Sequence, residues 1–81
     1  MIRLGYNPST NSLYIIYEEN DCVMRIEQRG EEISIFFNGD LINQLYVEDI
    51  HKLTISDFLY NKCAYEMWKK IIYSFLSSFS L

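Results

Sequence analysis

The chain has 81 residues, 49% of them hydrophobic and 16% aromatic, and carries a net charge of −4 at pH 7. This length predicts a single domain, residues 1–81, and the composition is too rich in core-forming side chains for a disordered chain. Residues 1–50 hold nine acidic and three basic side chains, a balance of −6, which disfavours direct binding of nucleic acid by that part.

The first predicted element is a β-hairpin. Two β-prone runs, residues 1–6 and 12–17, flank the cluster NPSTN, in which Asn7 and Pro8 favour the start of a turn and Asn11 tolerates a positive φ. In the second run the side chains alternate between two faces, with Leu13, Ile15 and Tyr17 on one face and Tyr14 and Ile16 on the other.

Three more strands are predicted before residue 50. Residues 22–28 alternate in the manner of a half-buried strand, with Cys22, Met24 and Ile26 on one face and Val23, Arg25 and Glu27 on the other. In residues 33–38, Ile33, Ile35 and Phe37 share a face, and the Asn38-Gly39 pair that follows is a strong hairpin signal. In residues 41–48 we expect Leu41, Leu45 and Val47 to point inward, although Asn43 interrupts that face.

The period becomes helical from residue 56. The apolar stripe comprises Tyr60, Ala64, Met67, Trp68, Ile71, Ile72, Phe75, Leu76 and Phe79. Ser56, Asp57 or Asn61 can cap the helix, so it begins near Asp57 or just after Asn61. Glu66 and Lys70 are spaced as an i,i+4 ion pair. The sequence therefore predicts an α+β fold, an antiparallel meander of four to five strands in residues 1–50 with one long amphipathic helix, residues 56–79, packed on one face.

The opening hairpin resembles a family of small domains of unknown function. Members begin Tyr-Asp-Pro-x-x-Asp-x-Leu-Tyr-Ile and close with a hairpin similar to Asp-Gly-x-x-x-Gly-Ile-Glu-Ile. The residues that match the opening, with Asn in place of both Asp, are Tyr6, Asn7, Pro8, Asn11, Leu13, Tyr14 and Ile15. Residues 38–47 resemble the closing hairpin, with Asn43 or Gln44 where the second glycine is expected. The resemblance covers about the first 50 residues and implies a compact β-rich fold, an antitoxin-like role and no active site.

Residues that could carry catalysis or bind a metal are few. His51 is the single histidine, and we interpret it as a partly exposed junction residue. Cys22 and Cys63 lack metal-ligand spacing and are interpreted as buried or half-buried thiols. We expect no catalytic residue, no cofactor and no metal, and hence a protein that is not an enzyme. Two cysteines and no apolar leader or spanning segment favour a soluble protein of the reducing cytoplasm without membrane contact.

Two surfaces are candidates for binding a partner. Alternate turns of a meander lie at the same end, so we expect the acidic side chains of two turns to gather there: Glu18, Glu19, Asp21 and Asp40. Such an edge would fit a basic surface of another protein. Solvated turn charge, without a role in binding, is the alternative. A calcium site at these acids is disfavoured because the spacing of calcium ligands is missing.

The second candidate surface is aromatic. Tyr14, Phe36 and Tyr46 fall on the faces opposite the expected core, where they could anchor a partner. An incompletely wrapped core and a homodimer are the alternatives for this surface. The favoured function is a small acidic protein-binding module that acts as an inhibitor, either an antitoxin or a phage-encoded blocker of a defence nuclease in the anti-CRISPR style. The alternative function is a homo-oligomeric assembly protein that associates through the apolar helix face.

Overall fold

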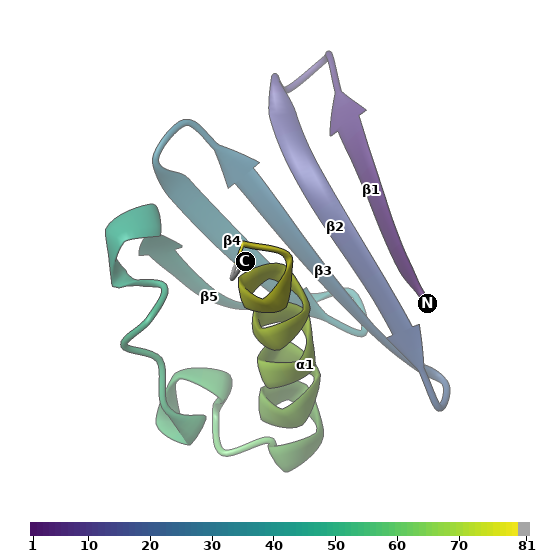
Figure 1. The fold of residues 1–81 in the computed structure, drawn as a ribbon, viewed down its shortest axis with the longest axis vertical. Coiled ribbons are helices and arrows are strands. Elements are labelled where there is room, and N and C mark those ends of the chain that lie inside the picture. The colour runs from purple at the N-terminus through teal and green to yellow at the C-terminus, as the bar shows by residue number, and fades with distance from the viewer. Residues whose placement is uncertain (80–81) are drawn as a thin grey trace.

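In the computed structural model, which describes the backbone of residues 1–79 and the side chains of residues 1–74, five strands form one antiparallel sheet. They pair in chain order, as Figure 1 shows. Their bounds are β1 Ile2–Asn7, β2 Ser12–Glu19, β3 Cys22–Arg29, β4 Glu32–Phe37 and β5 Asp40–Tyr46. Two short 3-10 helices, η1 Val47–Asp49 and η2 Ile55–Phe58, lead to the helix α1 Lys62–Phe79. The predicted meander followed by one helix is confirmed.

Two tight turns at the same end of the sheet set its register. Both central residues of each turn have positive φ, 49° and 64° at Asn20 and Asp21, and 49° and 89° at Asn38 and Gly39. Paired positive φ values match the right-handed twist of the flanking strands, so two-residue loops suffice. Asn38 also ties its turn to β3, because its side-chain oxygen accepts a hydrogen bond from the Val23 N–H at 2.8 Å.

The core lies between the sheet and the first half of α1. Its fully buried side chains are Met24, Ile26, Ile33, Ile35, Phe58, Ala64, Met67, Trp68 and Ile71. The strand residues in this set alternate with outward-facing ones, as the predicted faces of β3 and β4 require. Phe58 from η2 lies at the centre, with its ring centroid 5.6 Å from those of both Tyr65 and Trp68.

The predicted inward face of β5 is wrong at one position. A β-bulge shifts the register between Ile35 and Phe36, so that Leu41 pairs with Phe36 on the outer face and is half exposed. Ile42 packs against the core in its place. Asn43, which interrupts the apolar face in the sequence, donates a hydrogen bond from its amide to the Asp57 carbonyl at 3.3 Å. The bulge thus aims an apolar residue inward and lets a polar one tie β5 to η2.

The helix begins at Lys62, not at residue 56. Leu59 and Tyr60 have φ of 56° and 59°, which an α-helix cannot contain. Asn61 caps the new start by accepting a hydrogen bond from the Ala64 N–H at 3.1 Å, which agrees with the later of the two predicted starts. Tyr60 consequently precedes α1 and is exposed, in contrast to its predicted place in the apolar stripe. The side chains of Phe75, Leu76 and Phe79 lie outside the described residues.

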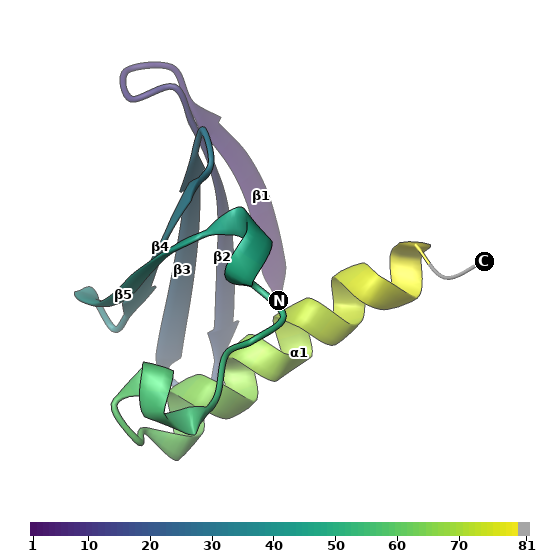
Figure 2. The same ribbon diagram turned by 90° about the vertical axis from the view of Figure 1, so that its left-hand side faces the viewer.

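The helix covers only part of the sheet. Figure 1 shows α1 in front of the middle of the sheet and away from β1, and Figure 2 shows its C-terminal end pointing away from the strands. Burial of the strands follows this geometry: Met24 and Ile35 under the helix are buried, whereas Leu4 on β1 and Leu13 on β2 are more than half exposed. Because the helix diverges, the concave side of β1 and the neighbouring Leu13 on β2 receive little cover, whereas Ile15 and Tyr17 of β2 still pack against the core.

Candidate functional site

The part of the concave sheet face that α1 leaves uncovered carries exposed apolar side chains. Register places Leu4 opposite Ile15 and Tyr6 opposite Leu13, on the face that also carries the core. Leu4, Tyr6 and Leu13 are nevertheless 67%, 52% and 56% exposed, and Ile2 beside them is 39% exposed. We call these four side chains the open half, and the core-facing side chains of β3, β4 and β5 the covered half.

A groove runs between the open half and α1. Its volume is about 370 Å³, and its walls are almost entirely apolar. Leu4 and Leu13 line it from the sheet, and Trp68, Ile71 and Ile72 line it from the helix. Apolar surface of this kind is more typical of a contact site than of a free surface, because isolated exposed apolar residues are common but contiguous ones are not.

The aromatic candidates do lie on the opposite, outer face, but apart from one another. Tyr14 on β2 pairs with Glu27 of β3, and Phe36 on β4 pairs with Arg25 of β3, so charged side chains separate the two rings. The Arg25 guanidinium lies 4.5 Å from the Phe36 ring centroid. Tyr46 is exposed near the far end of β5. These rings do not make one patch in the described structure.

Tyr14 has a structural role next to Gly5. The two residues are cross-strand partners, and a Cβ built on Gly5 would lie only 2.2 Å from Cζ of the Tyr14 ring. The ring therefore lies across the glycine backbone. This contact accounts for the glycine within β1 and for the half-buried state of Tyr14, so binding to a partner is not needed to explain either.

The four candidate acids share one end of the sheet but face different ways. Glu18 lies on the outer face and pairs with Arg3. Glu19 lies on the helix side and accepts hydrogen bonds from Nζ of Lys70 at 2.6 and 2.8 Å and from the Tyr17 hydroxyl at 2.7 Å. Two of the four acids are thus engaged within the fold.

The electrostatics of Glu19 follow from these contacts. The hydrogen bonds from Lys70 and then from Tyr17 lower the pKa of the Glu19 carboxyl below its usual value. The same pairing raises the pKa of Lys70, and the hydrogen bond to Glu19 raises the pKa of the Tyr17 hydroxyl. Lys70 was expected to pair with Glu66. In the structure, Glu66 pairs instead with Lys69 at 3.1 Å.

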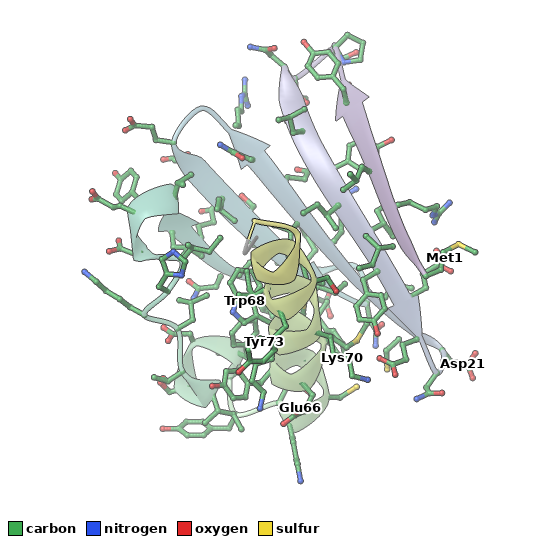
Figure 3. The ribbon with its side chains drawn as sticks, viewed as in Figure 1. Met1, Asp21, Glu66, Trp68, Lys70 and Tyr73 are labelled. Atoms are coloured by element: carbon green, nitrogen blue, oxygen red, sulfur yellow. The ribbon has the colours of Figure 1, made fainter. Side chains whose placement is uncertain are left out.

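Asp21 and Asp40 remain the more available acids. Asp21 lies at the tip of the turn between β2 and β3, where Figure 3 shows it pointing away from the sheet. Asp40 follows the turn at Asn38 and Gly39 and is also exposed. Among the described residues, neither carboxylate takes part in an ion pair. The negative charge at this end of the sheet is therefore smaller than that of four unpaired acids, because Arg3 and Lys70 compensate the charges of Glu18 and Glu19.

The two cysteines, 41 positions apart, meet where β3 begins and α1 makes its first turn. Sγ of Cys63 lies 3.5 Å from Sγ of Cys22, close enough for a weak hydrogen bond between the free thiols. That hydrogen bond, and then burial, raises the pKa of the Cys63 thiol. Cys22 is half-buried as expected, but Cys63 is exposed.

Other functional chemistry finds little support in the described part of the chain. His51 is exposed just after η1. Within residues that the structure describes, no three His, Cys, Asp or Glu side chains gather in a way that could hold a metal ion. None of the described helices combines the length and apolar character needed to cross a bilayer.

Comparison with family models, with curated proteins and with solved structures gives no significant match. The resemblance of the first 50 residues to a family of small β-rich domains therefore stays a prediction. The argument for function depends on the surfaces of this chain itself.

Neither the groove nor the contact between the thiols of Cys22 and Cys63 was predicted from the sequence. Alternation places Leu13 on the same face as Ile15 and Tyr17, but it cannot tell that α1 leaves the sheet before reaching Leu13. The sequence does hold one signal for the groove. β1 and β2 together supply more inward-facing apolar side chains than one helix can cover.

Proposed function

We propose that this chain is a protein-binding module that receives apolar side chains of a protein partner in the groove beside the open half. The observation that carries the proposal is the exposure of Leu4 and Leu13 along one wall of an apolar groove. A groove with apolar walls and no cationic side chain in its lining suits a protein better than a nucleic acid.

The role we propose for this module is inhibition of a partner with a basic surface, in the reducing cytoplasm. The net charge of −4 and the position of both acidic turns at one end of the sheet support it. Charge complementarity would speed encounter, while the groove would supply most of the affinity. Because Glu18 and Glu19 are already paired, Asp21 and Asp40 are the acids that would act on such a partner.

Site-specific photo-crosslinking tests the groove. A photoreactive phenylalanine analogue at Leu13 should crosslink a partner, whereas the same group at Val23, exposed on the outer face, should not. Leu13→Lys should then weaken binding of the crosslinked partner and Val23→Lys should leave it unchanged. Equal crosslinking at the two positions, or equal binding by the two variants, would refute the groove as the binding surface.

The inhibitor role needs a second measurement on the same partner. Asp21→Lys with Asp40→Lys should slow association and flatten its dependence on salt, because screening acts on exposed charges. If the salt dependence of association is unchanged, the acidic turns take no part in binding, and the proposal that the partner has a basic surface is wrong.

A further inference from the structure

The free edge of β1 differs from the free edge of β5. The β5 edge is bulged beside Phe36, and the Asn43 amide holds it to η2. Bulges and covering segments are the usual means by which proteins prevent an edge strand from pairing with another chain. β1, with the sequence IRLGYN, has neither a bulge nor a proline or lysine.

The hydrogen-bond pattern tells which backbone groups of β1 are free to pair. The Glu18 N–H donates to the Met1 carbonyl at 3.1 Å, so Met1 and Glu18 form a hydrogen-bonded pair. Antiparallel ladders alternate such pairs with non-bonded ones. Arg3, Gly5 and Asn7 therefore direct their N–H and C=O groups toward β2. Those of Ile2, Leu4 and Tyr6 point to the open edge.

We propose that the open edge of β1 pairs with β1 of a second copy of this chain, antiparallel and centred on Leu4. The inference rests on the proposed function in one respect, since it assigns a partner to the same open half. In this register Leu4 lies opposite Leu4 of the second copy, and Ile2 lies opposite its Tyr6. Within the part of the chain that the structure describes, the edge groups of all three residues have no hydrogen-bond partner, so the backbone pairing can be complete across the strand.

The side chains of this pairing are self-complementary. Ile2, Leu4 and Tyr6 project from the concave face, so the two open halves join into one apolar surface. The one charged residue of β1, Arg3, lies on the outer face opposite Gly5 of the second copy, over which the uncharged ring of that copy's Tyr14 lies. Arg3 is also paired with Glu18 in its own chain. No like charges meet directly, so the pairing avoids the repulsion that destabilises a cross-strand pair.

The symmetry of the contact also fits a second copy. Two identical strands exchange hydrogen bonds at three positions each, and the joined sheet places the apolar face of one copy beside that of the other. A C2 interface of this kind needs only one surface patch to be complementary to itself. β1 meets that condition because its free positions are symmetric about Leu4.

Charge pairing at Leu4 tests the register. Leu4→Lys should weaken self-association about tenfold or more, because two lysines would then lie opposite each other. Leu4→Glu should do the same. An equal mixture of the two variants should form a heterodimer again. Sedimentation equilibrium over a wide concentration range measures all three. Leu4 is mostly exposed, so both variants should fold, and far-UV circular dichroism checks this.

Leu13→Lys and Leu13→Glu are the matched controls. Leu13 belongs to the same open half but lies on β2, away from the free edge, so mixing these two variants should not restore a heterodimer in the way that the Leu4 mixture does. Amide hydrogen exchange gives an independent readout. Ile2, Leu4 and Tyr6 should become protected as the wild-type concentration rises, whereas Arg3 and Gly5 should be protected at every concentration.

Three outcomes would overturn the inference: a wild-type chain that stays monomeric at high concentration, a dimer that Leu4→Lys leaves intact, or a mixture of Leu4 variants that fails to pair. None of these affects the groove, which the crosslinking at Leu13 tests by itself. Conversely, a dimer that responds to Leu4 as expected would stand even where Leu13 and Val23 crosslink equally.

Discussion

The covered half and the open half belong to one face of one sheet, yet they differ in almost every physical respect. Met24 and Ile35 in the covered half are completely buried under α1 and η2, whereas Leu4 and Leu13 in the open half are more than half exposed. The difference arises from the direction of one helix, whose C-terminal end points away from the strands in Figure 2. The one helix of this small domain covers the core side chains of β3 and β4, and Ile15 and Tyr17 of β2 also pack against that core, whereas Leu4, Tyr6 and Leu13 stay mostly exposed.

The largest expected effect is on the free energy of unfolding, when a buried side chain and a side chain of the open half are each truncated to alanine. Phe58→Ala should destabilise the domain by about 3–5 kcal/mol, because it removes a fully buried ring that contacts Tyr65 and Trp68. Leu13→Ala should change the stability of the dilute monomer by no more than about 0.5 kcal/mol. Urea unfolding with constant slope measures both. Similar losses for the two variants would mean that the open half is covered in solution.

A disulfide between Cys22 and Cys63 should stabilise the covered half. Thiol–disulfide exchange with a small disulfide such as oxidised glutathione would release two thiols and join β3 to α1. Closing this loop should stabilise the domain by about 2–4 kcal/mol. Because the hydrogen bond to Cys22 and burial raise the pKa of Cys63, the exchange should accelerate as the pH rises.

The oxidised and reduced proteins are compared by urea unfolding, with intramolecular linkage confirmed by mass spectrometry. Cys63→Ser is the control, since it should give the same stability under both conditions. Failure to form an intramolecular link in the folded protein, where the two sulfur atoms lie 3.5 Å apart, would contradict the observed placement of α1 on β3.

The sheet was predictable because its signals are local. Alternation along β3 and β4 and the Asn38-Gly39 turn were enough to give strands, faces and order. The bulge in β5 was not predictable, because Leu41 and Ile42 are equally apolar and neither the alternation nor the turn signal tells which of them points inward. The helix start was ambiguous because Asp57 and Asn61 are both good caps. In the structure Asp57 belongs to the capping box of η2, whose N-cap is Thr54, and Asn61 caps α1.

The candidate site was predicted less well because its properties depend on distances between segments remote in sequence. The positions of Glu18 and Glu19 were correct, but their partners Arg3 and Lys70 come from β1 and α1. A helical spacing made Glu66 the expected partner of Lys70, since sequence reports neighbours along a helix and not those across to a sheet. The open half depends in the same way on where the helix axis points.

A smaller effect is expected at the contact of Gly5 with Tyr14. Gly5→Ala should destabilise the monomer by about 1 kcal/mol, because the new Cβ would displace the Tyr14 ring. In the Tyr14→Ala background the same change should be close to neutral, since nothing then occupies the space over residue 5. A double-mutant cycle measured by urea unfolding gives the coupling. Equal costs in both backgrounds would show that the glycine is needed for another reason.

The smallest effect concerns pH and the ion pair that fixes α1 beside β2. Lys70 and Tyr17 lower the pKa of Glu19, so its contribution to stability is present above the usual value of 4.5 and is lost as the pH falls through the lowered pKa. Lys70 has a raised pKa, so its contribution is present below 10.5 and is lost as the pH rises through the raised value. The side chains are largely solvated, which keeps both changes small.

Glu19→Gln should remove both pH-dependent losses of stability together. Asp21→Asn should leave both in place, because Asp21, two residues further along the chain, takes part in no ion pair among the described residues. Urea midpoints between pH 2 and pH 6 and between pH 9 and pH 12 measure the difference between each variant and the wild type. The pair lies at the end of the sheet where α1 is still close to the strands, so losing it should let the helix diverge earlier. Amide exchange in the first half of α1 should then increase in Glu19→Gln and remain unchanged in Asp21→Asn; an equal increase in both variants would show that the pair does not hold the helix in place.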